Sequence, residues 1–414
     1  MRYKILLLSD DIRKHTGVSN ISKQIILNTC DEIDWIQISC GANKNINEII
    51  DVSESIQKLT GKTGSVKLYP TSHYGNSVIL REVLRKENPT AILHITDPHR
   101  WMWMYEMEHE LRLSIPILYY HVWDNTPYPY FLKDIYKSCD WIGCASKLTY
   151  ECVKNVVNEH KAVEYIPHGV DTNIFKKLDM NVSEKHRNGF LGKNYKFVVL
   201  VNNANIKRKE LPSVIESFDK FCKKLSDTEQ TDTVLLLHTN PENKLGTNLN
   251  TLVDDCYSHL NIKFSVESVN ETWLNYIYNL ASVTINIASN EGFGITTLES
   301  LATCTPIIIN KTGGLQDQYL DSCGIAIQPK VRNLVGSQKT PYLYSDICST
   351  DEVADALYTI FKNKENYIDS NKYESFIAGN MFRSEQMCVS IKRSIIQTIQ
   401  SFTKRARYKI GQVK

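Results

Sequence analysis

The stretch Val283–Glu299 reads VTINIASNEGFGITTLE and sets the pattern for the rest of the chain. Its first five residues, VTINI, are mostly apolar or β-branched and predict a strand that is buried on both faces. Two glycines follow, at positions 292 and 294, and leave room for close approach to the backbone because they carry no Cβ. The residues from Gly294 onward predict a helix. A strand, a glycine turn and a helix in this order are typical of α/β proteins with parallel sheets.

The same alternation of short apolar runs and amphipathic stretches extends from end to end. The predicted strands are Tyr3–Ser9, Trp35–Ser39, Ala91–Ile95, Ile117–His121, Trp141–Ala145 and Val163–Ile166 in the first half, and Phe197–Val201, Thr233–His238, Ile262–Phe264, Val283–Ile287, Pro306–Asn310 and Gly324–Ile327 in the second. Between strands, Leu211–Leu225 carries an apolar helical stripe. Because the βα pattern occurs twice, we predict an α/β protein with two doubly wound, Rossmann-like domains.

The polar stretch Lys176–Asn194 has few apolar residues and predicts a linker between the two domains. We therefore assign residues 1–180 to an N-terminal domain and residues 194–380 to a C-terminal domain. Residues 381–414 remain for a C-terminal helix and a basic tail. The chain looks helical from about Tyr373 to Thr403.

Composition and charge favour an ordinary folded protein. The net charge of +2 over 414 residues predicts neither a strongly basic nucleic-acid face nor an acidic tail. The apolar run in the opening MRYKILLLSDD is too short for a signal peptide or a membrane helix. The eleven cysteines are scattered without a C-x-x-C pair. We expect reduced thiols in a cytoplasmic protein, with no zinc site and no disulfide framework.

The glycine turn also carries the sharpest chemical signal. Exposed N–H groups at the start of the predicted helix favour a bound diphosphate. Glu299 lies eight residues after Glu291, more than a turn inside the helix, where its carboxylate can accept hydrogen bonds from vicinal hydroxyls. The alternative is an ordinary strand–turn–helix, with Glu291 as a cap and Glu299 on a solvated face.

Two further loops follow strands of the same domain. Asn202–Lys209 (NNANIKRK) ends in three consecutive cations, which can neutralise a leaving diphosphate but also occur at solvated helix starts. Asn310–Asp317 (NKTGGLQD) again places two glycines behind a strand. Because the carboxyl ends of parallel strands meet at one edge of a sheet, the three loops are predicted to converge on one crevice.

The segment EGFGITTLE resembles the glutamate–seven residues–glutamate motif of the family 4 retaining glycosyltransferases, whose usual form reads E-G-F-G-L-x-x-x-E. Other segments are similar in the family's order, from about residue 5 to residue 320: the glycine loop His15-Thr16-Gly17-Val18-Ser19, Ile166–Asp171 with Phe175 (family P-N-G-V-D-x-x-x-F), Lys209 (family G-R-x-x-x-x-K-G) and Thr312-Gly313-Gly314. The resemblance implies the GT-B fold, in which two doubly wound domains face a central cleft and a C-terminal helix packs back on the N-terminal domain.

The resemblance also implies roles for single residues. The C-terminal domain would bind a nucleoside diphosphate sugar as donor, and the N-terminal domain would bind the acceptor. Lys209 would contact the diphosphate, Glu291 the sugar and Glu299 the ribose hydroxyls, while His121 would lie beside the reacting centre. The catalytic residues would be His121, Lys209 and Glu291. The donor-binding residues would be Gly17, Asn205, Arg208, Lys209, Glu291, Gly292, Phe293, Gly294, Ile295, Glu299 and Gly314.

Two positions depart from the family pattern. The arginine five residues before Lys209 is replaced by Ala204, so its charge would come from Arg208 or Lys207, or be absent. The family G-G-x-x-E reads Gly313–Asp317 here, which ends in a shorter carboxylate. No aspartate pair is spaced D-x-D, the metal-holding arrangement of GT-A glycosyltransferases. We therefore expect no metal and no other cofactor, since cations and helix N-termini can stabilise the leaving group.

Two aromatic loops of the N-terminal domain, Thr96–Trp103 (TDPHRWMW) and His121–Tyr128 (HVWDNTPY), follow predicted strands. Aromatic faces stack on sugar rings and on nucleobases. The predicted acceptor-binding residues are Asp97, Trp101, Trp123 and Asp124. The alternative places the tryptophans in a core or an interface, and His121 among satisfied core histidines. The basic run Lys404–Lys409 is either a solvated tail or a weak contact to anionic lipid or DNA phosphates.

These inferences predict a retaining, metal-independent hexosyltransferase. The expected reaction moves a hexose, preferably glucose from UDP-glucose, to a hydroxyl on a glycan or a lipid-linked sugar. A hydroxymethylated base in DNA, as in viral-type DNA glycosyltransferases, is the alternative acceptor. Two other classes stay open: a GT-B-fold sugar-nucleotide epimerase and a non-catalytic sugar-nucleotide-binding protein.

Overall fold

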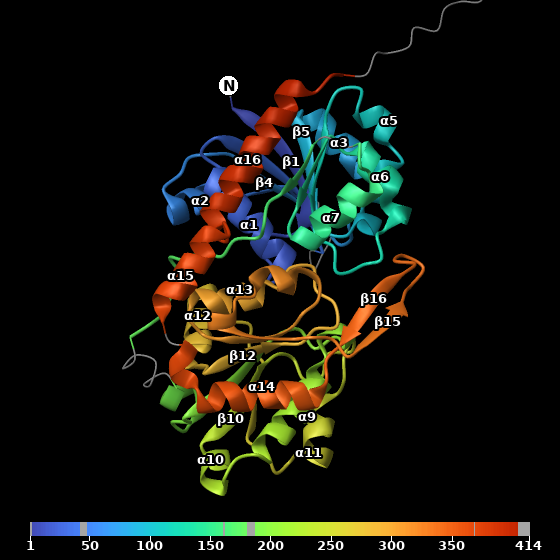
Figure 1. The fold of residues 1–414 in the computed structure, drawn as a ribbon. Helices are drawn as coiled ribbons and strands as arrows, with labels where there is room; N and C mark the ends of the chain where they lie inside the picture. Colours follow the sequence, from blue (N-terminus) through green and yellow to red (C-terminus); the bar gives the residue numbers. More distant parts are fainter. Residues whose placement is uncertain (1, 42–47, 160–161, 180–186, 368, 405–414) are drawn as a thin grey trace, which may run out of the picture. The chain divides into compact units, whose positions relative to one another are not determined.

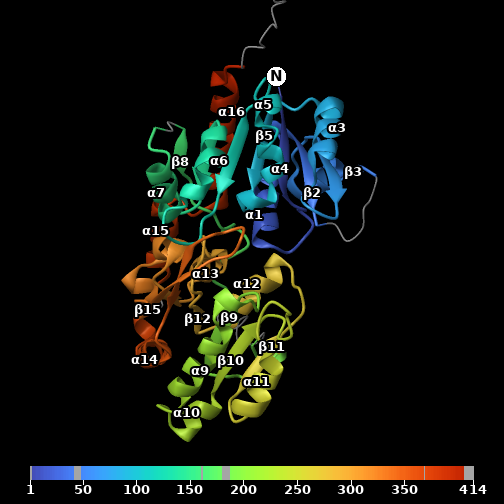
Figure 2. The same ribbon diagram turned by 90° about the vertical axis from the view of Figure 1, so that its right-hand side faces the viewer.

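The structure is a computed structural model that describes residues 2–41, 48–159, 162–179, 187–367 and 369–404. The chain divides into two compact units. The N-terminal unit comprises Met1–Val122, Tyr128–Pro167 and Glu385–Lys414, and the C-terminal unit comprises Trp123–Pro127 and His168–Ser384. In each unit, helices cover a central sheet (Figures 1 and 2).

The N-terminal unit is built on an eight-stranded sheet with the order β3-β4-β2-β1-β5-β6-β7-β8. Its strands are β1 (Tyr3–Asp10), β2 (Ile33–Cys40), β3 (Ile50–Asp51), β4 (Val66–Thr71), β5 (Ala91–Ile95), β6 (Ile117–His121), β7 (Trp141–Cys144) and β8 (Val163–Tyr165). Neighbouring strands are parallel, except that β3 runs antiparallel to β4. The strand β4 was not predicted, because Lys67 and Pro70 interrupt its apolar run.

Helices pack on this sheet, and the last of them comes from the end of the chain. They are α1 (Gly17–Thr29), α2 (Ser53–Thr60), α3 (Ser77–Glu87), α4 (Met102–Tyr105), α5 (Glu108–Leu111), α6 (Lys133–Ser138), α7 (Lys147–Val156) and α16 (Ser384–Ser401). Ile391 and Ile395 of α16 join Ile5 and Leu7 of β1 and Ile25 of α1 in one buried cluster. The prediction that a C-terminal helix packs on the N-terminal domain is confirmed (Figure 1).

The C-terminal unit contains a six-stranded parallel sheet with the order β11-β10-β9-β12-β13-β14. Its strands are β9 (Phe197–Asn202), β10 (Thr233–His238), β11 (Ile262–Ser265), β12 (Val283–Asn286), β13 (Ile307–Asn310) and β14 (Gly324–Ile327). Val198 and Leu200 of β9 belong to one buried cluster, while Val199 and Val201 belong to another. Alternate residues therefore face opposite sides, and both sides are buried, as the continuous apolar runs predict.

The helices of this unit are α9 (Leu211–Cys222), α10 (Asp227–Thr231), α11 (Leu249–Cys256), α12 (Glu271–Leu280), α13 (Ile295–Ala302), α14 (Thr350–Lys362) and α15 (Ser370–Gly379). The single helical stretch expected from Tyr373 to Thr403 is broken between α15 and α16. Met381 has a φ of 60° in this break, and the neighbouring Phe382 is fully buried. The left-handed backbone at Met381 ends the helical path.

The boundaries of the units differ from the predicted ones. The segment 168–179 was assigned to the N-terminal domain, but Val170 and Phe175 lie in a core cluster of the C-terminal unit. Part of the predicted linker, residues 180–186, lies outside the described residues. The last part of the predicted linker belongs to the C-terminal unit, because Leu191 is buried in the same core. Tyr195, just after the predicted linker, is buried there too. Trp123–Pro127 also belongs to the C-terminal unit.

A two-stranded antiparallel ribbon, absent from the prediction, stands between β14 and α14. It consists of β15 (Val331–Val335) and β16 (Leu343–Ile347), which pair only with each other in the sheet order. Figure 1 draws it as an orange hairpin. Its strands are mixtures of charged, polar and apolar residues, so no continuous apolar run marks them in the sequence.

Candidate functional site

The strand order of the C-terminal unit reverses between β9 and β12. The chain continues from β9 toward β10 on one side, and from β12 toward β13 on the other. In open α/β sheets, ligands bind at the carboxyl ends of the two strands that flank such a reversal. The segments that follow these strands are residues 203–210 after β9 and residues 287–294 after β12.

Three charged side chains meet between these two segments. Lys209 lies in the short helix η3 (Lys207–Lys209), and its Nζ pairs with the carboxylate of Glu291. Arg208 Nη1 donates to Oε2 of Glu291 at 3.1 Å and to the backbone oxygen of Asn290 at 2.8 Å. The structure therefore brings together three residues that the sequence singled out, Arg208, Lys209 and Glu291.

Burial and charge act on this group in opposite directions. Burial alone would raise the pKa of Glu291, but the charges and hydrogen bonds of Arg208 and Lys209 outweigh burial and lower that pKa to about 2. Burial lowers the pKa of Lys209, and the nearby carboxylates of Glu291 and Asp124 oppose this shift. Glu291 is thus ionised at neutral pH, in a place where it and Lys209 are both buried.

Backbone contacts fix the loop that carries Glu291. The N–H of Ser289 donates to the backbone oxygen of Arg208 at 2.8 Å, which ties the two loops together. Gly294 has a φ of +87° and directly precedes α13. A Cβ on Gly294 would lie 2.5 Å from Cδ2 of Leu315. The positive φ favours glycine here, at the point where the first-turn amide groups of α13 begin, and an added Cβ would also have to displace the Leu315 side chain.

The third glycine-containing loop packs against the second. It includes the helix η4 (Gly313–Gln318), and the N–H of Gly314 donates to the backbone oxygen of Glu291 at 2.8 Å. A Cβ on Gly314 would lie 2.3 Å from the backbone oxygen of Gly292. A Cβ on Gly313 would lie 2.5 Å from the backbone oxygen of Asp124. These glycines allow three chain segments to touch. The donor contact of Gly314 stays a prediction.

Glu299 lies inside α13 and is buried against a tyrosine. Tyr278 Oη donates to Oε2 of Glu299 at 2.7 Å, and Asn202 Nδ2 donates to Tyr278 Oη at 2.8 Å. Burial raises the pKa of Glu299 to about 8, although the hydrogen bond from Tyr278 acts in the opposite direction. Glu299 is therefore mostly protonated at neutral pH, and it lies at the carboxyl end of β9 through its link to Asn202.

His121 belongs to the N-terminal unit, at the end of β6. Its side chain is fully buried and its Nε2 is hydrogen-bonded to Tyr136 Oη at 2.8 Å. The imidazole also packs on the ring of Tyr119 at a centroid distance of 4.5 Å. Burial lowers the pKa of His121 to about 3, so the imidazole is neutral at physiological pH.

Several predicted contact residues are buried in cores instead. Trp101 is fully buried, and its Nε1 donates to the backbone oxygen of Ile95 at 3.2 Å. Trp123 is 6% exposed. Phe293 lies in the core cluster of the C-terminal unit, edge-on to His168 at 4.9 Å. The rings of Trp101, Trp123 and Phe293 are thus all buried, and the ligand contacts of these three residues stay predictions.

Asn205, a predicted donor-binding residue, is hydrogen-bonded to a neighbouring loop. Its Nδ2 donates to the backbone oxygens of Pro241 and Thr247 at 3.1 and 2.7 Å, and its Oδ1 accepts from the N–H of Thr247 at 3.3 Å. The amide group is occupied on both sides by this neighbouring loop. Asn205 therefore holds the loop after β10 in place, and its donor contact stays a prediction.

Gly292 is buried in the Glu291 loop, while three other predicted residues are at least partly exposed. Gly17 is exposed at the first turn of α1, where the side chain of Thr16 caps the helix. Asp97 is exposed before the helix η1 (Pro98–Arg100), and Ile295 is partly buried at the start of α13. Lys404 is described, but the rest of the basic run, residues 405–409, lies outside the described residues. The ligand contacts of these residues stay predictions.

The sequence analysis missed a polar network beside the Glu291 loop. Asp346 on the ribbon is fully buried and accepts hydrogen bonds from Asn125, Thr312 and Arg332. A signal was present, because Asp346 is the one acidic residue between Lys330 and Ile347. A single aspartate in a mostly polar segment is nevertheless expected to be exposed to solvent, unless its buried partners are known.

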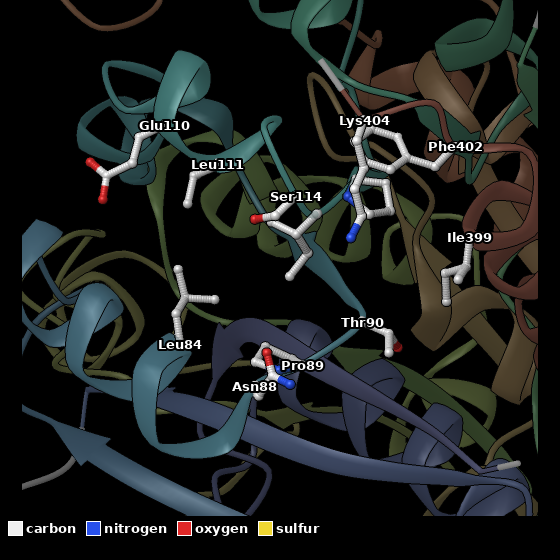
Figure 3. A pocket seen from close by; sticks show the side chains of 12 residues that line it. Leu84, Asn88, Pro89, Thr90, Glu110, Leu111, Ser114, Ile399, Phe402 and Lys404 are labelled. Atoms are coloured by element: carbon white, nitrogen blue, oxygen red, sulfur yellow. The ribbon is translucent and has the colours of Figure 1, made fainter. Parts of the chain in front are cut away.

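The N-terminal unit contains a cavity of about 460 Å³ (Figure 3). Thr90 and Pro116 line it, and they directly precede β5 and β6. The cavity therefore lies at the amino ends of these strands, opposite the edge where α/β sheets bind ligands. It is not part of the candidate site.

Two kinds of feature are absent from the described residues. No helix there is both long and apolar enough to cross a membrane. No three side chains from His, Cys, Asp and Glu are grouped there in a way that would hold a metal ion. The eleven cysteines, all within the described ranges, are free thiols.

A known protein family matches the part of the chain that contains this cluster. Residues 181–336 match the family model described as Glycosyl transferases group 1, and this range contains Arg208, Lys209, Glu291 and Glu299. No curated protein sequence matches the chain.

Solved structures match over nearly the whole chain. HepE from Anabaena, in complex with UDP and glucose, is 13% identical with a TM-score of 0.70, and the match covers 96% of this chain and 100% of HepE. Sucrose-phosphate synthase from Thermosynechococcus elongatus is 14% identical with a TM-score of 0.72, covering 97% and 100%. The catalytic domain of starch synthase IV from Arabidopsis thaliana, bound to ADP and acarbose, is 12% identical with a TM-score of 0.64, covering 96% and 99%. The chain thus has the α/β GT-B fold of these glycosyltransferases.

Proposed function

We propose that this protein is a glycosyltransferase that takes a hexose from a nucleoside diphosphate sugar. The observation that carries the proposal is the buried cluster of Arg208, Lys209 and Glu291 at the strand-order reversal of the C-terminal unit. The match of residues 181–336 to group 1 glycosyl transferases supports the same class. UDP-glucose is the preferred donor, since HepE is similar in fold and its structure holds UDP-glucose.

The two cations would stabilise the leaving diphosphate. Lys209 and Arg208 are held against one carboxylate, Glu291, so their combined charge exceeds that of their partner. An incoming diphosphate adds negative charge and would draw Lys209 away from Glu291. The first-turn amide groups of α13 offer further donors to phosphate oxygens. Fixed cations in a buried site stabilise developing charge without reorganisation during the reaction.

Arg208 is proposed to replace the arginine that the family pattern places at Ala204. Ala204 is exposed and has no charge to offer. Arg208 Nη1 instead reaches Glu291 Oε2 beside Lys209. A guanidinium thus occupies the cluster although the sequence position is shifted, which supports a catalytic over a purely binding protein.

Glu299 is proposed to bind the ribose of the nucleotide. A protonated carboxyl group both donates and accepts, so it can bond two vicinal hydroxyls. The raised pKa of about 8 keeps Glu299 in this form at neutral pH. His121 is proposed to lie beside the sugar as a neutral hydrogen-bonding group, in line with its lowered pKa of about 3.

The proposed reaction retains the configuration of the sugar, as the resemblance implies. The bond from the anomeric carbon to the diphosphate oxygen breaks, and a bond to the acceptor oxygen forms on the same face. The acceptor proton passes to the departing diphosphate. Lys209 and Arg208 balance the charge that the diphosphate gains, so the step needs no metal ion.

The acceptor is proposed to be a hydroxyl of a glycan or a lipid-linked sugar, bound by the N-terminal unit. Asp97 of the N-terminal unit remains a candidate polar contact because it is exposed. Asp124, the other candidate, is half-buried and belongs to the C-terminal unit. A hydroxymethylated DNA base is the competing acceptor. Duplex DNA binding with a steep salt dependence would favour it.

The test measures nucleotide release from a panel of sugar nucleotides. We expect Lys209→Ala and Glu291→Ala to lower release by at least tenfold. Lys196→Ala is the matched control, since Lys196 precedes the amino end of β9 and has a side chain that is 79% exposed. Unchanged release in both site variants would contradict the assignment.

The same panel separates the other classes. Interconversion of the donor sugar without an acceptor would identify an epimerase. Tight nucleotide binding with neither transfer nor slow donor hydrolysis would identify a binding protein. Release that continues in excess EDTA is the expected result for metal-independent chemistry, and an absolute requirement for Mg²⁺ would contradict it.

A further inference from the structure

The ribbon β15–β16 lacks the support that short hairpins need. Two strands alone are marginally stable in water unless another surface covers them. All five residues of β15 are exposed, and Leu334 is 63% exposed. Figures 1 and 2 show the ribbon as a separate hairpin rather than a strand pair of the main sheet. Apolar packing of β15 therefore does not explain what fixes the position of the ribbon.

A single buried carboxylate holds it. Arg332 on β15 donates to both carboxylate oxygens of Asp346 on β16, from Nε at 2.6 Å and from Nη2 at 3.0 Å. Oδ2 of Asp346 also accepts from Thr312 Oγ1 at 2.7 Å and from Asn125 Nδ2 at 2.8 Å. Four hydrogen bonds thus converge on one fully buried group, from the ribbon and from two other segments.

Backbone groups of β16 extend the connection. The N–H of Asp346 donates to the backbone oxygen of Ser289 at 2.7 Å, and its backbone oxygen accepts from Asn310 Nδ2 at 2.7 Å. The N–H of Tyr344 donates to the backbone oxygen of Thr126 at 2.7 Å. One edge of the ribbon therefore bridges the loop after β12, the loop after β13 and the segment Trp123–Pro127.

These three segments are the ones that carry the candidate site. Ser289 is two residues before Glu291, Thr312 directly precedes Gly313, and Asn125 directly follows Asp124. A Cβ on Gly313 would lie 2.1 Å from the backbone oxygen of Glu291, so the segments already touch there. The hydrogen-bond partners of Asp346 are thus only one or two residues away in sequence from Glu291, Gly313 and Asp124.

The chemistry of the network demands an ionised carboxylate. Burial alone would raise the pKa of Asp346, but the hydrogen bonds from Arg332, Asn125 and Thr312 outweigh burial and lower it. The donors on Arg332 and on the Asn125 amide need acceptors. An amide in place of the carboxylate would turn one acceptor oxygen into a donor and leave two donors facing each other.

We propose that Asp346 is a positioning residue for the transfer reaction, which acts through Asn125 and Thr312 to set Asp124 and the Glu291 loop. The inference rests on the proposed function of the same site. Asp346 does not contact Lys209 or Arg208 through any of the bonds above. Its loss is therefore expected to slow the chemical step while leaving the cationic grip on the nucleotide largely intact.

The test compares Asp346→Asn with the matched control Asp219→Asn. Asp219 is also a buried carboxylate of the C-terminal unit, paired with Lys223 and His259 and outside the network. We expect Asp346→Asn to lower kcat at least tenfold, with the Kd for UDP within threefold of wild type. Asp219→Asn should leave kcat within threefold of wild type at an equal or larger loss in the urea midpoint.

The outcomes separate this inference from the proposed function. A kcat for Asp346→Asn within twofold of wild type overturns the positioning role. So does a parallel loss of kcat, UDP affinity and urea midpoint, since that is the pattern of a merely structural residue. A wild-type protein that transfers no sugar from any donor overturns the proposed function itself.

Discussion

Lys209 and Glu291 form a buried ion pair, which keeps the Lys209 ammonium group beside the Glu291 loop. Removing Glu291 would leave the buried Lys209 without this carboxylate partner, which is strongly unfavourable for a buried charge. In our proposal the diphosphate replaces Glu291 as the partner of Lys209. In this proposal Glu291 keeps Lys209 in place until the anionic ligand binds.

Glu299 gives a residue-level prediction about pH. Its pKa is about 8 in the folded protein against an ordinary value near 4.5. Between these values the unfolded chain has lost the proton while the folded protein keeps it. The contribution to stability is thus full below about pH 4.5 and is lost as the pH rises toward 8, by at most about 1.4 kcal/mol per pH unit.

We expect Glu299→Gln to remove this dependence, because glutamine does not titrate. Urea unfolding of both proteins at pH 5.5 and pH 8 measures it. The wild type should lose more stability over this interval than the variant. Equal losses would show that Glu299 titrates at its ordinary pKa.

Single residues were predictable where chemistry and position in the chain coincide. Lys209 and Glu291 stand at the ends of predicted parallel strands, and topology alone brings such ends together. Trp101 and Asn205 also stand near strand ends, but a sequence does not say which way a side chain points. Trp101 turned into the core, and Asn205 turned to the neighbouring loop.

At the scale of elements, the glycine loops allow a prediction about packing. A Cβ on Gly314 would meet backbone atoms of Gly292 and Phe293 at 2.3 and 2.6 Å, and backbone cannot move aside as a side chain can. We expect Gly314→Ala to lower the free energy of unfolding by about 1–3 kcal/mol.

Gly379→Ala is the matched control for this substitution. No heavy atom lies within 4 Å of the Cβ that it would add, and its φ is not positive. Its stability in urea should equal that of wild type or exceed it slightly. A Gly314→Ala variant as stable as this control would contradict the close packing of the loops.

Strands were predictable from the sequence where both faces of the strand are buried. Strands such as Phe197–Asn202 are apolar throughout, since both faces meet a core. The strand β4 and the ribbon β15–β16 escaped prediction for the opposite reason. The ribbon is held by one buried carboxylate, Asp346, and by backbone hydrogen bonds, and neither leaves a periodic apolar pattern in the sequence.

At the scale of the whole molecule, the end of the chain completes the core of the N-terminal unit. Ile391 on α16 is fully buried there, while Val389 on the same helix is 59% exposed. We expect Ile391→Ala to cost about 2–5 kcal/mol in unfolding free energy. Val389→Ala should change it by no more than about 0.5 kcal/mol. Equal effects in urea unfolding would contradict the packing of α16.

The sequence pattern predicted the two-domain α/β fold but placed its boundary too late. Polar composition suggested a linker from Lys176, whereas the C-terminal unit already begins at His168. Isolated apolar residues such as Val170 and Phe175 are enough to anchor a segment to a core, and composition averaged over a stretch does not reveal them. The detour of Trp123–Pro127 into the C-terminal unit is likewise invisible without coordinates.

The central claim is that the C-terminal unit grips the nucleotide diphosphate with Lys209 and its neighbours. Equilibrium binding of UDP in the presence of EDTA tests it most directly, with wild type, Lys209→Ala and Lys196→Ala compared. The account predicts that wild type and Lys196→Ala bind alike, while Lys209→Ala binds at least tenfold more weakly. UDP binding that is unaffected by Lys209→Ala, or that appears only after Mg²⁺ is added, would contradict it.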